Sequence, residues 1–386
     1  MIEINGEYAS AKIFVTNNEE TAIEGYALDQ IKALCNNNSA IDSKIRVMPD
    51  VHPGAGCVIG LTMTVHDKIM PNLVGVDIGC GVTIAKLKVK AKDLDFNKLD
   101  KVIREEVPSG FSVRTESHTY ADLSVEQLRC GKHMNIERAN LSIGTLGGGN
   151  HFIEVDKDDE GNLYLVVHSG SRHLGVEITE WYLKQGQAIL KDKGFDIPYE
   201  MTYLEDELKD DYLYDLEQAQ MFAADNRLAI IDVITKSMKW KTEEIFSSIH
   251  NYVDFSDPVN PILRKGAISA AKDKRLIIPI NMRDGVILGT GLGNEDWNYS
   301  APHGAGRIMS RKQAKNSFTV SAFKKEMKDI HCTCVCDDTL DESPFAYRNI
   351  EDILEVIGDT IKIDKIIKPI YNFKASEVQP WQKGKK

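Results

Sequence analysis

Apolar side chains recur at helical spacing in the early part of the chain. Within residues 19–35 they fall at Ile23, Ala27, Ile31 and Leu34, a spacing that predicts an amphipathic helix packed on the body of the protein. Further along, β-rich runs and longer helical patterns follow one another, which predicts a mixed α/β or α+β architecture. The predicted strands cover Lys44–Met48, Val82–Val89 and Leu163–Val167, and the later predicted helices cover Gly175–Lys193 and Asp215–Lys239.

A single interwoven catalytic domain over residues 1–386 is the predicted organisation. No proline- or glycine-rich linker divides the sequence, and no repeat period is visible. Residues with catalytic chemistry come from both halves, so a site that uses them must be assembled across the whole fold. The polar stretch Gly194–Asp211 is the best candidate for a surface insertion, and residues 376–386 are predicted to form a flexible, solvated tail.

Composition and charge narrow the class of protein. The chain has 386 residues, of which 42% are hydrophobic, enough for a sizeable core. No run of about 18 apolar residues occurs and no signal-peptide pattern is present, so we expect a soluble cytoplasmic protein without a membrane partner. Seven cysteines, an odd number, favour free thiols. The net charge of −11 argues against a protein that binds nucleic acid along its length, but it does not exclude an enzyme that binds only RNA ends.

Cys80 lies in the glycine-rich turn Gly75–Gly81, three positions after Asp77. Four histidines in glycine-rich or polar settings follow downstream. One thiolate, one carboxylate and several imidazoles form a ligand set that suits a catalytic divalent transition metal, and the glycines let a polyphosphate approach the backbone. The pattern predicts a metal-assisted phosphoryl or nucleotidyl transfer centre that includes His151, His168, His250 and His303.

Other cysteines and histidines lack such surroundings. A cysteine alone is more often a small buried apolar residue, which is the prediction for Cys35 and Cys130. In His331–Cys336 three cysteines alternate with other residues, so a strand would place them on one face, where they cannot easily surround a tetrahedral metal. We therefore predict buried apolar cysteines in that segment. Three further histidines are predicted to be structural or exposed: His66, His118 and His133.

Four strings of the sequence together resemble the RtcB-type RNA ligases. They are Met48–Gly54, Asp77–Gly81, Gly144–Phe152 and His303–Arg311, and the match runs in order from about Met48 to Lys374. The resemblance implies an α+β fold with mixed sheets flanked by helices. It also implies that GTP and two manganese ions serve to join an RNA 3′-phosphate, or a 2′,3′-cyclic phosphate opened to it, to a 5′-hydroxyl. The expected intermediates are a covalent histidine–GMP and an RNA activated by GMP at its 3′-phosphate.

The resemblance also assigns roles to single residues. Cys80, His168 and His250 match one metal site, while Asp77, Cys80 and His151 match the second. His303 matches the guanylated nucleophile, and Arg172 and Arg307 would hold phosphates of the nucleotide or RNA. The positions that match nucleotide contacts are Asn150, His151, Phe152, Glu154, Asn251, Pro279, Ile280, Asn281, Met282, His303, Gly304, Ala305, Gly306 and Lys374.

Two departures from the family pattern leave nucleotide fit and RNA choice open. The loop Ile278–Gly285 lacks the usual serine- and glycine-bearing sequence, and His173 stands where a glycine is usual. The short form of the chain and the altered loop suggest a divergent branch of the family that serves RNA repair more than tRNA splicing. Two other classes remain: a metal-dependent RNA-end phosphodiesterase or nuclease, which would not need His303, and a non-catalytic RNA-end-binding module, which would need neither the metals nor that histidine.

Overall fold

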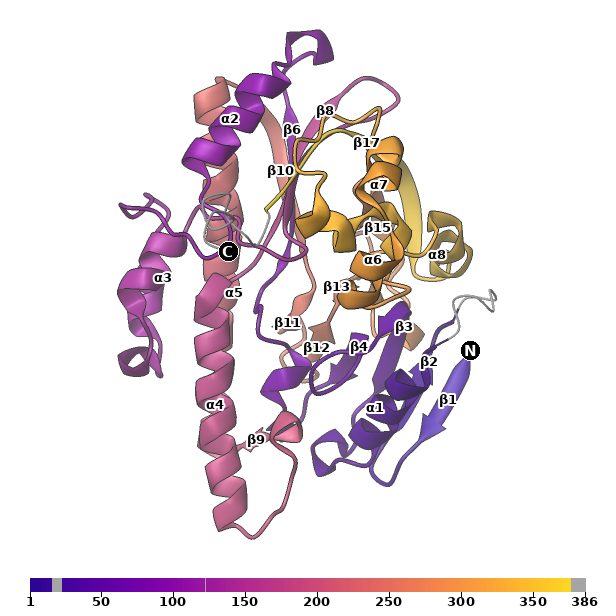
Figure 1. Cartoon of the computed structure of the whole chain (residues 1–386). Coiled ribbons are helices and arrows are strands. Elements are labelled where there is room, and N and C mark those ends of the chain that lie inside the picture. Colours follow the sequence, from indigo (N-terminus) through magenta and orange to yellow (C-terminus); the bar gives the residue numbers. More distant parts are fainter. Residues whose placement is uncertain (16–22, 122, 376–386) are drawn as a thin grey trace.

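A seven-stranded sheet forms the centre of the structure (Figure 1), a computed structural model that describes residues 1–15, 23–121 and 123–375. Every neighbouring pair in this sheet is antiparallel. The strand order is β10 (Thr242–Ile249), β6 (Gly81–Leu87), β8 (Leu163–Ser169), β7 (Phe152–Lys157), β17 (Ile361–Lys374), β15 (Gly285–Gly291) and β14 (Arg275–Asn281).

A second sheet of six strands is mixed, because β2 and β3 run parallel while its other neighbours are antiparallel. Its order is β1 (Ile2–Asn5), β2 (Ser10–Ile13), β3 (Ile45–His52), β4 (Ile59–Thr64), β12 (Ile262–Lys265) and β11 (Asn251–Asp254). Two short antiparallel pairs complete the strands: β13 (Ala267–Ser269) with β16 (Ser300–Pro302), and β5 (Lys68–Ile69) with β9 (Leu204–Glu205). The predicted α+β class is confirmed.

Helices cover both sides of the central sheet. In Figure 1 α2 and α5 lie on one side, with α4 packed along the lower part of α5, and α6, α7 and α8 lie on the other. No helix of the described ranges is long and apolar enough to cross a membrane. The helices are α1 (Gly25–Cys35), α2 (Phe96–Glu106), α3 (Ile136–Ser142), α4 (Arg172–Asp192), α5 (Asp206–Met238), α6 (Arg311–Ser317), α7 (Val320–Glu326) and α8 (Ile350–Ile357).

Strand β8 is buried on both faces, and its alternation decides which residues reach the site. Leu165 and Val167 pack in the core that α2 and α5 share with the sheet. His168 therefore points to the opposite face. In the register of β7 and β8, Phe152 lies opposite His168 and Glu154 lies opposite Val166, so all of these share that face. The continuous apolar run in the sequence is thus a doubly buried strand that carries a histidine at its end.

The predicted elements are confirmed with shifted boundaries. The first helix begins at Gly25, and the part of its prediction at residues 19–22 lies outside the described residues, as does the predicted tail at 376–386. Helix α4 begins at Arg172 instead of Gly175, and α5 begins at Asp206 instead of Asp215. The predicted insertion Gly194–Asp211 is therefore partly helical. Acidic residues stabilise the first turn of α5, and this turn lacks the apolar periodicity by which helices were recognised in the sequence. Its status as an insertion stays a prediction.

The segment with three alternating cysteines is irregular, and of the three cysteines predicted to be buried only Cys334 is buried. His331–Cys336 is not a strand but an irregular turn between α7 and the short helix Asp337–Glu342. Only His331 forms a bridge, with Tyr371 of β17. Beside Tyr371, β17 pairs only with β7, because its pairing with β15 ends at Ile367, and the chain turns at Thr333 and Cys334 instead of extending along the other edge.

Candidate metal and nucleotide site

Strand pairing brings Cys80 and His250 together. Cys80 precedes β6, and His250 follows β10, which is antiparallel to β6 with Ile249 opposite Gly81. The backbone N–H of His250 donates to the carbonyl of Cys80 at 2.9 Å. The turn before β6 is closed by the N–H of Cys80, which donates to the carbonyl of Asp77 at 3.1 Å. Asp77 and Cys80 therefore project from one rigid turn.

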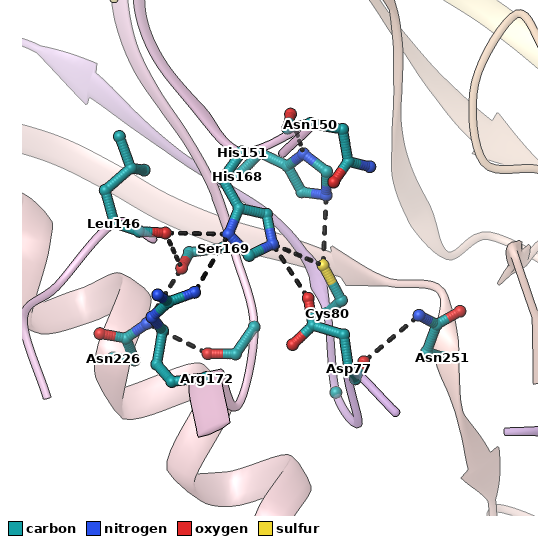
Figure 2. Close-up of polar contacts among 12 residues, drawn as sticks. Asp77, Cys80, Leu146, Asn150, His151, His168, Ser169, Arg172, Asn226 and Asn251 are labelled. Atoms are coloured by element: carbon teal, nitrogen blue, oxygen red, sulfur yellow. Dashed lines mark hydrogen bonds and ion pairs between the residues drawn. The ribbon is translucent and has the colours of Figure 1, made fainter. Parts of the chain in front are cut away.

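His168 and His151 complete the cluster from β8 and from the residue before β7. The Nε2 atom of His168 lies 3.3 Å from Cys80 Sγ, and the Nε2 atom of His151 lies 3.5 Å from the same sulfur (Figure 2). His151 Nε2 is also 2.9 Å from Asp77 Oδ2. Two groups of potential ligands result, each with its atoms within 4.8 Å of one another: Cys80, His168 and His250, and Asp77, Cys80 and His151. Cys80 is common to both.

Hydrogen bonds at the far nitrogens orient two of the imidazoles. His151 Nδ1 is 2.9 Å from the carbonyl of Leu146, and His168 Nδ1 is 3.2 Å from the carbonyl of Asn150 (Figure 2). A carbonyl only accepts, so each Nδ1 carries the proton and each Nε2 keeps its lone pair. This is the arrangement in which a histidine serves as a metal ligand.

The electrostatics of the cluster suit a cation. Burial lowers the pKa values of His168 and His250 well below the ordinary value, so both rings are neutral. Burial, reinforced by the charge of Asp77, raises the pKa of Cys80 well above its usual range. Burial opposes ionisation of Asp77 too, but the hydrogen bond and charge of His151 lower its pKa to about 2. Neutral imidazoles, a carboxylate and a thiol whose proton a cation can displace fit a divalent transition metal.

Two polar residues of α5 hold the loops of the cluster in place. Asn226 accepts from the backbone N–H groups of Gly144 and Thr145, and its amide donates to the carbonyl of Gly170 at 3.1 Å. Arg227 donates to the carbonyls of Gly79 and Ser169 at 2.7 and 2.9 Å. Both side chains are fully buried. They tie the turn before β6 to the end of β8.

Arg172 lies on the Asp77 side of the cluster, at the first residue of α4. Its φ is 58°, in the left-handed region, and its guanidinium contacts Thr145 Oγ1 and the carbonyl of Gly110. Arg172 and Asp77 line a cavity of about 540 Å³, called the second cavity below. Phe111, whose side chain is highly exposed, and His173 also line it.

A cavity of about 520 Å³, the nucleotide cavity below, opens on the other part of the cluster, at His168 and His250. Twelve of the fourteen residues matched to nucleotide contacts line it. The exceptions are His151, which lies in the cluster, and Asn251, whose side chain joins the carbonyl of Asp77 to the N–H of Gly266. The twelve are Asn150, Phe152, Glu154, Pro279, Ile280, Asn281, Met282, His303, Gly304, Ala305, Gly306 and Lys374.

His303 is positioned by a buried carboxylate. Its Nδ1 lies 2.7 Å from Asp50 Oδ2, and its backbone N–H donates to the same oxygen at 3.2 Å. Asp50 is fully buried, so the contact fixes the ring. The Nδ1 proton is then held by Asp50 and Nε2 is left with its lone pair. The ring centroid of His303 is 4.9 Å from that of His250, which places this lone pair beside the cluster.

Known proteins resemble this chain over most of its length. The family model described as tRNA-splicing ligase RtcB matches residues 30–130 and 116–375. The RNA-splicing ligase RtcB of Escherichia coli K12 is 32% identical over 83% of this chain and 87% of its own length. RtcB2 of another Escherichia coli strain is 26% identical over 95% and 97%, and the tRNA-splicing ligase RtcB of Pyrobaculum aerophilum is 23% identical over 83% and 85%.

The chain belongs to the RtcB family. Both the predicted family and the predicted enzyme class, RNA ligase, are confirmed. Within this RtcB-family chain, the five proposed metal ligands and His303 lie together. His66, His118 and His133 stand apart from them, and Cys35 and Cys130 are fully buried.

Some residues of this RtcB-family site escaped the sequence analysis. Asn226 and Arg227 sit within an apolar helical pattern, and a polar pair on such a face was the signal that could have revealed them. Glu342 lies 2.5 Å from Lys374 Nζ and 3.2 Å from Arg307 Nη1. Arg307 also donates to the carbonyl of Asp341, so its guanidinium is largely engaged by the protein, and its role with phosphate stays a prediction.

Proposed function

We propose that this protein joins an RNA 3′-phosphate or 2′,3′-cyclic phosphate end to a 5′-hydroxyl end, with GTP as the activating nucleotide and manganese as the metal. His303 would attack the α-phosphate of GTP, and GMP would then pass to the RNA 3′-phosphate. The observation that carries the proposal is the position of His303, with its free Nε2 beside both the metal cluster and the nucleotide cavity. RNA repair or tRNA splicing in the cytoplasm would be its setting.

Asp50 would act as the positioning group for the nucleophile. It holds the Nδ1 proton of His303 and would stabilise the positive charge that develops on the ring as Nε2 attacks phosphorus. Gly304 and Gly306 follow directly, and a Cβ at Gly306 would meet the backbone of Asp50. The tight turn therefore keeps the carboxylate against the ring and leaves room for phosphates.

Two manganese ions would be held by Cys80, His168 and His250, and by Asp77, Cys80 and His151. Bound there, they would neutralise phosphate charge and keep the attacking and leaving oxygens in line. Because Cys80 belongs to both ligand groups, its thiol lies buried between the imidazoles of both. On the protein side, Lys374, whose Nζ is 3.2 Å from the carbonyl of Asn150, supplies positive charge to the nucleotide cavity.

Glu154 and Phe152 would contact the guanine. Burial raises the pKa of Glu154 to about 8, although Asn372 and Lys374 oppose the shift. The carboxyl is then largely protonated near neutral pH, so it can both donate and accept hydrogen bonds at the edge of a purine. Phe152, on the same face of β7, offers an aromatic surface in the cavity.

The two cavities would receive different substrates. The nucleotide cavity meets the cluster at His168 and His250, and the second cavity meets it at Asp77. In-line displacement of GMP requires the attacking 5′-hydroxyl to approach from the side opposite the leaving nucleotide. The second cavity, with Arg172 for phosphate and Phe111 for a base, is therefore assigned to the RNA end that carries the 5′-hydroxyl.

A covalent GMP adduct tests the proposal. Protein incubated with α-labelled GTP and manganese should retain label through a bond that is labile in acid and comparatively stable in alkali, and peptide mapping should place it on His303. His303→Ala should remove the adduct and leave manganese binding largely intact. His52→Ala, which alters another histidine lining the same cavity, is the matched control. Label on a residue other than His303 contradicts the assignment.

The same experiment separates the other classes. A phosphodiesterase or nuclease would process RNA ends with manganese but would form no adduct. A non-catalytic RNA-end-binding module would neither form the adduct nor bind manganese. The buried pairing of His303 with Asp50 favours the ligase over both, because neither rival needs an oriented imidazole nucleophile.

A further inference from the structure

Two cysteine sulfurs outside the metal cluster touch each other beside the nucleotide cavity. Cys332 Sγ lies 3.1 Å from Cys334 Sγ, in the turn that follows α7. Both are free thiols in this structure. Residues two apart in a turn have Cα atoms within the range that a disulfide can span. The pair can therefore close a disulfide with little movement of the backbone.

The charge distribution makes one of the two sulfurs reactive. The backbone N–H of Lys374 donates to Cys334 Sγ at 3.2 Å, and the two sulfurs share an S–H hydrogen bond in which either one can be the donor. The hydrogen bond from Cys332 lowers the pKa of Cys334 in spite of burial, and the N–H and charge of Lys374 act in the same direction. Burial instead raises the pKa values of Cys35 and Cys57 to about 11. Thiolate character favours oxidation of Cys334 over those two residues.

The pair is connected to the nucleotide cavity through β17. Cys332 Sγ contacts Asn372 Oδ1 at 3.8 Å, and the amide of Asn372 donates to Glu154. Cys334 Sγ accepts from Lys374, whose Nζ reaches Glu342 at 2.5 Å. Cys332 thus contacts Asn372, which binds the lining residue Glu154, and Cys334 contacts Lys374, which itself lines the nucleotide cavity.

We propose that Cys332 and Cys334 are a redox modification site, at which a reversible disulfide weakens nucleotide binding. The effect on the nucleotide rests on the proposed function, whereas the disulfide itself does not. Closing the bond brings the sulfurs from 3.1 Å to about 2.05 Å and weakens Cys334 Sγ as the acceptor of the Lys374 backbone N–H. Because Lys374 lines the nucleotide cavity, we expect roughly tenfold weaker GTP binding, which corresponds to about 1.4 kcal/mol.

Hydrogen peroxide is the oxidant class that fits a small, mostly buried pair. The Cys334 thiolate attacks one peroxide oxygen, the O–O bond breaks, and hydroxide leaves to give a sulfenic acid. The Cys332 sulfur then loses its proton and attacks the Cys334 sulfur, which expels hydroxide. In sum, two thiols and one peroxide give one disulfide and two waters. A dithiol reductant reverses the step by exchange.

Differential alkylation of the full chain tests the disulfide. Trypsin should release Asp329–Arg348, which contains Cys332, Cys334 and Cys336 and no internal lysine or arginine. After peroxide this peptide should carry one alkylated thiol instead of three, and reduction should restore three. Cys336→Ser should keep the disulfide, because Cys336 Sγ contacts Thr339 and not the pair. Cys332→Ser and Cys334→Ser should each abolish it.

Binding of a fluorescent GTP analogue with manganese tests the coupling. Peroxide should weaken binding about tenfold in the parent and in Cys336→Ser, but not in Cys332→Ser. The Cys80 peptide is followed in parallel, so that oxidation of the metal cluster is not mistaken for this effect. Three free thiols after peroxide, or equal affinity of the oxidised and reduced forms, would overturn the inference. A reduced protein that binds no GTP would contradict the proposed function and the coupling, and the alkylation result would still decide the disulfide.

Discussion

Glu342 and Lys374 form a buried ion pair at the wall of the nucleotide cavity, with Oε2 and Nζ 2.5 Å apart and both side chains no more than 4% exposed. The carboxylate also contacts Arg307 and Arg311, so a single buried anion offsets one of the three positive charges around it and leaves the wall net positive. Without it the cavity would concentrate positive charge that is costly to bury. The pair therefore sets both the stability of this wall and the charge that the proposed nucleotide would meet.

Stability should fall in acid because of Glu342. Burial opposes its ionisation, but Lys374, Arg311 and Arg307 lower its pKa to about 2, below the ordinary value of 4.5. A carboxyl group whose pKa is lowered by folding stabilises the folded state at pH values above its unfolded pKa. It loses that contribution as the pH falls from about 4.5 to about 2. Its size is on the order of 3 kcal/mol. Urea unfolding at pH 7 and pH 3 should show a smaller difference for Glu342→Gln than for the parent, with the exposed Glu217→Gln as control. An unchanged difference in Glu342→Gln would contradict this account.

Removing the sulfur shared by both ligand groups should abolish manganese binding. Cys80→Ala takes a ligand from each group, so calorimetry should detect no binding and every catalytic step should stop. Cys332→Ala removes a thiol outside the cluster and should leave manganese binding unchanged. Intact binding in Cys80→Ala would show that the ion lies elsewhere.

Joining should depend on the chemistry of the RNA ends. Oligonucleotides with a 3′-phosphate or 2′,3′-cyclic phosphate and a 5′-hydroxyl should be sealed in the presence of GTP and manganese. A gel assay that also includes the reverse pair, 3′-hydroxyl with 5′-phosphate, provides the control. Efficient sealing of that reverse pair would place the protein in a different ligase class.

Phe111 should affect one substrate only. Its side chain is 86% exposed in the second cavity, and Arg138 anchors its carbonyl at 2.9 Å. Because stacking of a base on an aromatic ring contributes about 1–3 kcal/mol, Phe111→Ala should raise KM for the 5′-hydroxyl strand about fivefold to a hundredfold. GMP adduct formation should not change. Phe195→Ala, at an exposed phenylalanine after α4, is the control, and an equal effect of both variants would remove the assignment.

Asn226→Ala should destabilise the fold and loosen the cluster together. It removes the side chain that accepts from the N–H groups of Gly144 and Thr145 and donates to the carbonyl of Gly170, and Thr145 then keeps only its bond to the Ser142 carbonyl. Buried unpaired groups cost about 1–3 kcal/mol each, so we expect a loss on the order of 3 kcal/mol in urea unfolding, with weaker manganese binding by calorimetry. Glu217→Ala on the exposed face of the same helix should do neither. Unchanged stability would mean that these loops are held by other contacts.

The sequence predicted elements whose apolar pattern is strong, and missed those set by distant contacts. Leu163–Val167 was recognised as a strand because burial on both faces makes its residues uniformly apolar. The start of α5 at Asp206 was missed because its first turns are polar. The irregular turn at His331–Cys336 has no sequence signal, because alternating residues are compatible with a strand whether or not pairing continues beyond His331. The metal ligands were found through family motifs, whereas the contact of Asp50 with His303 spans 253 positions and has no local signal.

That span also bears on how the protein is made. During synthesis Asp50, Asp77 and Cys80 leave the ribosome well before His250 and His303 are added to the chain. The N-terminal residues of the site are therefore present for a time without the residues that they contact in the folded protein. Contacts of such sequence separation are formed late and slow the final folding step. During that time the thiol of Cys80 lacks the histidines that enclose it in the finished protein. Newly made chains are therefore the population in which this thiol is least enclosed by the protein.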